Sequence, residues 1–311
     1  MAKIALKVDV DTLRGTREGV PNLARVLEHL HLHATFLFSL GPDHTGWALK
    51  RVFRPGFLKK VGRTSVVEHY GIRTLLYGVL LPGPDIGQLA REEMQAIHRA
   101  GHETGIHAWD HVAWHDGVRN RNAKWTLKHM QLAYDRFQEI FRRPPSTAGA
   151  AGWQMNEVAL QQLDSWGLKY ASDGRAPLNL APYRLLFPAE KKGAPPSKSQ
   201  CIQYPTTLPT LDELIGVAGM DAFAAVRHLL SLTQSNPNDQ VFTLHAELEG
   251  QKLLPAFVEL IEGWLLQGHH LVTLGELHQS WVATQQLDKI MACPLSWGTV
   301  PNRSGELMVL P

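Results

Sequence analysis

Asp9 and Asp11 stand two residues apart at the end of the alternating stretch 4–10. In an ideal strand, residues i and i+2 point to the same side of the sheet. Two carboxylates held so close together repel each other, and a divalent cation removes that repulsion. The pair therefore indicates either a metal site, in which one carboxylate binds the ion and its neighbour acts as a base, or a solvated acidic loop.

His107 and His111 are separated by four residues in HAWDH, a spacing that lets two imidazoles reach one metal ion. His102 and Glu103 imitate the start of a zinc-protease HExxH motif. In HETGIH, however, the second histidine comes one residue too late for that motif, so the metalloprotease reading is rejected. A histidine-rich loop without a metal remains the alternative.

Three further titratable residues stand near the ends of predicted elements. Asp173 closes LKYASD, His245 lies in VFTLHAE, and Arg143 ends a long helical stretch. Because chemistry in barrel-like α/β domains collects where strands end, Asp173 and His245 are candidates for the same site. The simpler alternatives are a packed strand histidine for His245 and a favourable helix C-terminus for Arg143. Asp164 competes with Asp173, but its segment reads as a helix surface.

The elements that must position these residues alternate along the chain. Predicted strands cover 4–10, 34–41, 168–173, 201–207, 241–247 and 270–277, and residues 102–111 are predicted to be a short strand followed by a loop. Predicted helices cover 21–32, 85–101, 123–143, 156–167, 221–233 and 254–268. Residues 175–200 are predicted to be a loop. Such repeated alternation predicts a barrel-like or distorted TIM-type α/β domain rather than an open Rossmann sheet. Neither GxGxxG nor GxxxxGK[ST] occurs, so the usual phosphate-binding motifs are absent.

Composition narrows the class of protein. The chain has 311 residues, 44% of them hydrophobic, and a net charge of +2, which is too balanced to indicate nucleic-acid binding. Cys201 and Cys293 form no CxxC pattern, so neither a disulfide framework nor a thiolate metal site is indicated. The first residues alternate where an export signal would be continuously apolar, and we expect a cytoplasmic protein.

The stretch from Trp47 to Leu81 is both basic and apolar, and lies in a predicted insertion over 42–87. Its basic residues, set against the single acid Glu68, are Lys50, Arg51, Arg54, Lys59, Lys60, Arg63 and Arg73. Its apolar runs are too broken to span a bilayer. We expect this segment to lie on an anionic membrane surface, with a dimer interface or a solvated lid as alternatives.

The chain resembles the polysaccharide deacetylase family, known by its NodB-homology domain. Five elements of that family occur here in order: VDVDT, HAWDH, RRPPS, YASDG and FTLHAE. Many members instead have adjacent aspartates, and continue the Arg-Pro-Pro segment with Tyr-Gly. The resemblance implies an α/β fold, a distorted (β/α) barrel. It also divides the chain into a deacylase domain over 1–283, which includes the insertion, and a C-terminal extension over 284–311.

The resemblance also implies roles for individual residues. Asp11, His107 and His111 are expected to bind Zn²⁺, with Mn²⁺ or Co²⁺ as other possible ions. Asp9 is expected to act as general base, with Arg143 paired to it. His245 is expected to protonate the leaving amine, with Asp173 holding its other ring nitrogen.

Within the family, the sequence is most similar over its whole length to deformylases of formylated aminoarabinose linked through phosphate to undecaprenol. This implies hydrolysis of that formamide, release of formate, and supply of the aminoarabinose that modifies lipid A and confers resistance to cationic antimicrobial peptides. It also implies a peripheral position on the cytoplasmic face of the inner membrane. Alternatives are a deacetylase of another N-acylated sugar, a DxD glycosyltransferase, which would leave the histidines unused, and a non-catalytic lipid-carrier-binding protein.

Overall fold

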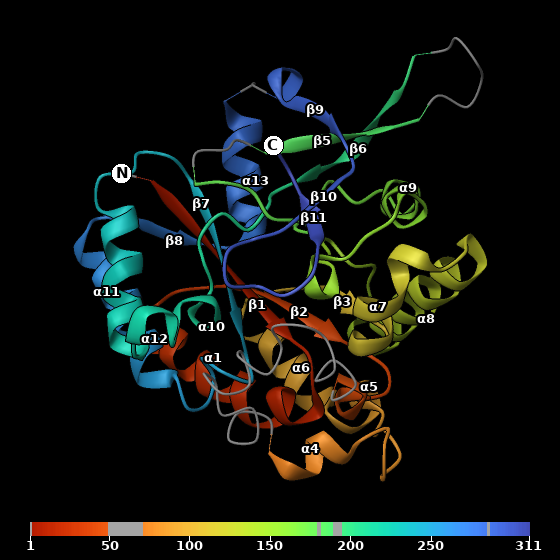
Figure 1. Ribbon diagram of the computed structural model, residues 1–311, viewed down its shortest axis with the longest axis horizontal. Coiled ribbons are helices and arrows are strands. Elements are labelled where there is room, and N and C mark those ends of the chain that lie inside the picture. The colour runs from red at the N-terminus through yellow and green to blue at the C-terminus, as the bar shows by residue number, and fades with distance from the viewer. Residues whose placement is uncertain (1, 49–70, 179–181, 189–194, 285–286) are drawn as a thin grey trace.

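Figure 1 shows the computed structural model of the chain, in which residues 2–48, 71–178, 182–188, 195–284 and 287–311 are described. A parallel sheet surrounded by helices is built from strands within residues 3–108 and 240–272. A smaller sheet lies at the other end of the molecule, at the top of the view. The C-terminal residues run back between the two.

The larger sheet has the strand order β3-β2-β1-β7, and all its pairings are parallel. Its strands are β1 (Lys3–Val10), β2 (Thr35–Ser39), β3 (Glu103–Ala108), β7 (Gln240–His245) and β8 (His270–Val272), which pairs with the start of β1. Because β1 has neighbours on both sides, its side chains are buried from Ile4 to Val10. Parallel strands end at one edge, so the residues that close β1, β3 and β7 meet there.

Amphipathic helices pack around the two sheets and against one another. The longer ones are α1 (Val20–His29), α6 (Arg91–Arg99), α8 (Ala123–Phe141), α9 (Glu157–Ser165), α11 (Ala222–Thr233), α12 (Leu254–Leu266) and α13 (Leu274–Ala283). Asn122, Asn156 and Asp221 cap α8, α9 and α11 by accepting a backbone N–H in the first turn. Met130 and Phe137 are among the residues that α8 buries in the core.

The short helical segments lie in the connections between the longer elements. They are η1 (Gly15–Gly19), α4 (Ile72–Leu76), α5 (Ile86–Leu89), α7 (His111–Gly117), η3 (Val118–Asn120), η4 (Ala151–Trp153), α10 (Leu211–Leu214), η5 (Val217–Gly219) and η6 (Leu287–Lys289). Two of them, α7 and η4, sit at the edge where the larger sheet ends (Figure 1). These loops, not the strands, therefore complete the surroundings of that edge.

The smaller sheet has the order β4-β6-β5-β9 and is completed by the end of the chain. Its strands are β4 (Tyr170–Ala171), β5 (Tyr183–Phe187), β6 (Ser197–Gln203) and β9 (Met291–Pro294), while β10 (Ser296–Gly298) and β11 (Leu307–Val309) form an antiparallel pair. The predicted loop over 175–200 is wrong, because β5 and the start of β6 form an antiparallel pair within it. Prolines and lysines in that stretch concealed a hairpin that alternates buried and partly exposed residues.

Another boundary also differs from the prediction. The strand expected over 270–277 ends at Val272, because the Thr273 side chain and Glu276 form a reciprocal cap that starts α13. The predicted α/β class is confirmed, with a parallel sheet, flanking helices and the strands of the described residues divided between separate sheets. The predicted (β/α) barrel is distorted in the sense that its strands do not all belong to one sheet.

Only the two ends of the predicted insertion over 42–87 belong to the described residues, and most of its basic stretch lies outside them. At its first end, Asp43 accepts the backbone N–H of Leu13, and His44 Nδ1 lies 2.6 Å from Asp110 Oδ2. At its second end, the turn after α4 exposes Val79, Leu80 and Leu81. None of the helices described is long and apolar enough to cross a membrane.

Candidate metal centre

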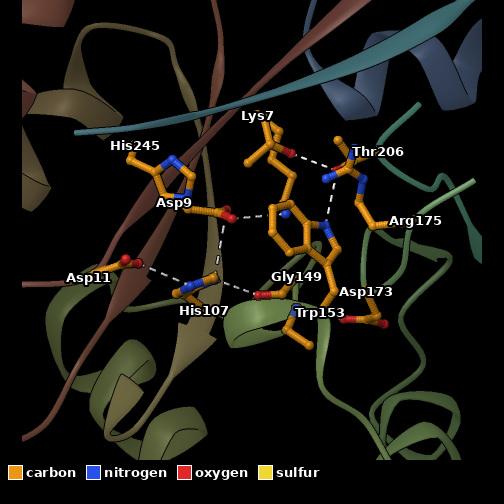
Figure 2. A network of polar contacts seen from close by, with 12 residues as sticks. Lys7, Asp9, Asp11, His107, Gly149, Trp153, Asp173, Arg175, Thr206 and His245 are labelled. Carbon is orange, nitrogen blue, oxygen red and sulfur yellow. Dashed lines mark hydrogen bonds and ion pairs between the residues drawn. The ribbon is translucent and has the colours of Figure 1, made fainter. Parts of the chain in front are cut away.

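Asp9, Asp11, His107 and His245 meet at the carboxyl edge of the larger sheet. Asp9 is in register with His245 on β7, and its other neighbour in the sheet is Leu37 on β2. Asp11 follows β1 directly, and His107 lies near the end of β3. Figure 2 shows these four side chains converging on one small region.

Asp11, His107 and His111 form a compact trio. His107 Nε2 lies 3.2 Å from Asp11 Oδ1, and His111 Nε2 lies 3.4 Å from Asp11 Oδ2. One ligand atom from each of the three residues lies within 4.8 Å of the other two. Two imidazole nitrogens and one carboxylate form a common ligand set for Zn²⁺ and related divalent ions. The structure thus brings together the three residues that the family resemblance implies as metal ligands.

Neighbouring groups orient the two histidines. His107 Nδ1 lies 2.7 Å from the carbonyl oxygen of Gly149 and donates to it, which leaves Nε2 to face Asp11. His111 is the first residue of α7, and Asp110 caps that helix by accepting the N–H of Ala113. The ring nitrogens that face Asp11 are therefore presented by a fixed strand end and a capped helix start.

The electrostatics of the trio favour a bound cation. Burial alone raises the pKa of the Asp11 carboxyl, but His111, His107 and His245 around it lower that pKa well below its usual value. Burial lowers the pKa of His107, whereas Asp9 and Asp11 raise it above the usual value. Asp9 Oδ1 and Asp11 Oδ1 are buried and accept no hydrogen bond within the described chain. These unsatisfied acceptors fit a divalent ion held by the trio.

The cation that contacts Asp9 is Lys7, not the expected Arg143. Lys7 Nζ lies 3.0 Å from Asp9 Oδ2, and the lysine side chain is completely buried. Both residues point to the same side of β1 because they are two positions apart. A lysine in an alternating stretch reads as solvent-facing, and only the central position of β1 reveals that it is buried.

Arg143 lies elsewhere. Its Nη2 donates to the Thr104 hydroxyl over 2.8 Å, and its guanidinium lies 5.5 Å from the ring centre of Phe137. α8 ends at Phe141, and Arg142 adopts a left-handed conformation (φ 56°) that redirects the chain there. The expected pairing of Arg143 with Asp9 is therefore corrected.

The expected pairing of His245 with Asp173 is also corrected. Asp173 accepts the backbone N–H of Ala150 over 2.9 Å and the side-chain amide of Gln203 over 2.8 Å. Burial raises its pKa to about 6, although Gln203 and Lys7 oppose that rise. His245 Nδ1 is buried and makes no hydrogen bond to any described group. Asp173 instead holds the loop that carries Gly149, the acceptor of His107.

Two buried glutamates behind the site escaped the sequence analysis. Glu247 Oε1 accepts the backbone N–H groups of Asp11 and Thr12, and Glu249 Oε2 accepts that of His245 over 2.7 Å. Burial raises the pKa of Glu247 well above the usual value, and the charge of Asp11 adds to that rise. Burial raises the pKa of Glu249 to about 8. The motif HAELEG reads as an acidic loop, and its position beneath the site depends on the fold.

An α/β fold that presents an Asp-His-His trio at its strand ends defines a class of protein built to hold a divalent ion. Residues 3–171 match the family model of polysaccharide deacetylases, and the chain belongs to this family.

Two relatives are similar over most of the chain. A protein of Shewanella sediminis (strain HAW-EB3) is 34% identical over 262 residues, which cover 84% of this chain and 81% of the relative. A protein of Wigglesworthia glossinidia brevipalpis is 31% identical over 293 residues, which cover 94% of this chain and 96% of the relative. Both are described as probable 4-deoxy-4-formamido-L-arabinose-phosphoundecaprenol deformylase ArnD.

Solved structures show the same fold at low sequence identity. Puue allantoinase superposes with a TM-score of 0.59 at 14% identity, with 91% of each chain covered. A Pseudomonas aeruginosa PAO1 protein described as a probable polysaccharide deacetylase superposes with a TM-score of 0.58 at 12% identity, also with 91% of each chain covered. These similarities support the predicted fold.

Proposed function

We propose that the protein is a divalent-metal-dependent deformylase that hydrolyses the formamide of 4-deoxy-4-formamido-L-arabinose linked through phosphate to undecaprenol. The observation that carries this proposal is the trio of Asp11, His107 and His111 with a separate carboxylate, Asp9, beside it. The relatives named for this reaction support the choice of substrate. The product amine would serve to modify lipid A.

In this proposal, Asp11, His107 and His111 hold the ion, for which Zn²⁺, Mn²⁺ and Co²⁺ are candidates. When bound, such an ion lowers the pKa of a water molecule and polarises the formyl oxygen. Asp9 accepts a proton from that water. Its Oδ2 is held by Lys7, while Oδ1 accepts no hydrogen bond from the described chain and is available for the proton. Lys7 holds the carboxylate in place.

His245 acts at the other side of the reacting bond. The water oxygen bonds to the formyl carbon, the C–N bond breaks, and the departing nitrogen takes a proton from the imidazole of His245. Glu249 holds the backbone of His245, and the register of β1 with β7 places the imidazole beside Asp9. The products are formate and a free amine on the sugar.

The lipid part of the substrate calls for a membrane surface, and we propose that the insertion over 42–87 supplies the contact. Leu80 is 76% exposed in the turn after α4, next to exposed Val79 and Leu81. The basic residues between 49 and 70 lie outside the described residues. Apolar side chains beside lysines and arginines suit an anionic membrane surface, here the cytoplasmic face of the inner membrane.

Formate release tests this function. Purified enzyme is mixed with the formylated lipid-linked sugar, with its acetylated counterpart, and with each plus a chelator. We expect formate from the first substrate, little acetate from the second, and loss of activity with chelator that added metal restores. Preference for the acetylated sugar would favour a deacetylase of another substrate, and binding without release of either acid would favour a lipid-carrier-binding protein.

A further inference from the structure

A large cavity lies outside the metal centre, between α10, α11 and the end of the chain. Its volume is about 640 Å³, within the range of small-molecule sites. Leu178, Leu214, Val300 and Val309 give it an apolar lining, and Arg175 and Glu213 lie in its wall. Val300 and Val309 belong to the proposed C-terminal extension over 284–311, so that extension forms one side of the cavity.

Arg175 and Glu213, which line the cavity, belong to a buried cluster of charged groups. Glu213 contacts both Arg175, at 2.5 Å, and Arg303, at 3.1 Å, and Asp212 lies close enough to oppose the lowering of the Glu213 pKa. Two guanidinium groups thus share the Glu213 carboxylate. Arg175 Nε is also buried and donates to no described group, although Arg175 itself is only 4% exposed. A buried arginine with an unused donor is suited to bind an anion.

Trp153 connects this wall to the metal centre. Its ring centre lies 5.3 Å from Lys7 Nζ, 4.9 Å from the Arg175 guanidinium and 4.1 Å from that of Arg303. Figure 2 shows the resulting sequence of side chains from Asp9 through Lys7 and Trp153 to Arg175. Trp153 also has a positive φ of 54°, a backbone conformation that bulky residues rarely adopt. The indole is therefore held in a costly position between the two regions.

We propose that this cavity holds the first prenyl units of the substrate, with the phosphate next to Arg175 and Arg303 and the sugar extending past Trp153 towards the metal centre. The proposal rests on the proposed function. A prenyl phosphate matches both features of the site, because its chain needs an apolar lining without hydrogen-bonding demands and its phosphate needs a cationic group with an unused donor, which Arg175 offers. The cavity takes only the part of the lipid nearest the phosphate.

Calorimetry with farnesyl phosphate and farnesol on the metal-loaded full chain tests this inference. We expect farnesyl phosphate to bind more tightly than farnesol. Val300→Trp should fill the cavity and weaken farnesyl phosphate binding about tenfold or more, whereas Val300→Ala should not. Arg303→Gln should remove most of the advantage of the phosphate, and Arg303→Lys should keep part of it. Leu266→Trp, on the exposed end of α12, serves as the matched surface control.

A photoreactive farnesyl phosphate gives a readout that does not depend on any variant folding. We expect it to label peptides that contain Val300 or Val309. Labelling confined to residues 71–81, or equal binding by Val300→Trp, would overturn the cavity assignment in favour of the insertion. Formate release from a water-soluble formamido sugar separates the two proposals: release without farnesyl phosphate binding rejects the cavity alone, and no release from any formamido substrate rejects the function.

Discussion

The metal centre and the charged cluster beside the cavity are both buried, but they leave different kinds of atoms without hydrogen bonds. At the strand ends, Lys7 contacts Asp9, His107 and His111 lie against Asp11, and each aspartate keeps one oxygen that accepts no hydrogen bond from the described chain. Beside the cavity, Arg175 and Arg303 share Glu213, and the Nε of Arg175 donates to no described group. Buried carboxylate oxygens of this kind suit a cation, and a buried guanidinium nitrogen suits an anion.

Removal of a metal ligand should have the largest effect on metal content and activity. His107→Ala takes away one of the three groups that hold the ion. We expect most of the metal to be lost and formate release to fall about a thousandfold or more. Metal analysis and activity, measured on the same sample, provide the check. Full metal occupancy with full activity would remove His107 from the ligand set.

Next in size should be the loss of a proton carrier. Asp9→Asn cannot accept the proton of water, and His245→Ala cannot donate one to the amine. We expect each to lower kcat by roughly 10²–10⁴-fold while the metal stays bound. If both variants lose their metal to the same extent as His107→Ala, these residues are ligands rather than proton carriers.

Two substitutions test whether Lys7 or Arg143 is the cation that supports Asp9. Lys7→Met leaves a buried carboxylate without its cation, which typically costs about 3–5 kcal/mol of stability. We expect slower formate release, because Asp9 Oδ2 then loses the group that holds it. Arg143→Gln is the control, and its rate of formate release should stay near that of the wild type. Loss of activity with Arg143→Gln and none with Lys7→Met would restore the original pairing.

Glu249 makes stability depend on pH in a defined direction. Its pKa is about 8 in the folded protein, against an ordinary value of 4.5. The folded state therefore keeps a proton that the unfolded chain loses, and stability falls as the pH rises from about 4.5 to about 8. Glu249→Gln should remove this fall. The free energy of unfolding is measured by denaturant at pH 5 and pH 8, with metal present. The value for the variant relative to that of the wild type should be higher at pH 8 than at pH 5. If the variant and the wild type differ in free energy of unfolding by the same amount at both pH values, Glu249 is not the group responsible.

The smallest effect on catalysis should come from the insertion. Replacing Lys50, Arg51, Arg54, Lys59 and Lys60 with glutamate should abolish flotation with anionic vesicles, because each basic residue near such a surface contributes on the order of 1 kcal/mol. Hydrolysis of a water-soluble formamido sugar should change little. Unchanged flotation would reject the membrane contact, and loss of activity on the soluble sugar would show that the segment shapes the site itself.

The class of fold and the segments that carry the site could be predicted from the sequence. Asp9 and Asp11 lie in one short segment and His107 and His111 in another, and the apolar alternation predicts that both segments end parallel strands. The position of His245 follows in the same way, because it closes a strand that pairs in register with that of Asp9. Local spacing indicates these residues as candidates, whereas the grouping of Asp11 with the two histidines around one ion was implied by the family resemblance.

The pairing of the buried charges could not be predicted from the sequence. Lys7 replaces Arg143 beside Asp9 because β1 is central and its lysine is buried. Asp173 was expected to hold His245 but instead accepts the N–H of Ala150, next to Gly149. Arg175 and Arg303 both contact Glu213, although 128 residues separate the two arginines. Hydrophobic periodicity reports which face of an element is buried, whereas the partner of a buried charge depends on which distant segment packs onto that face.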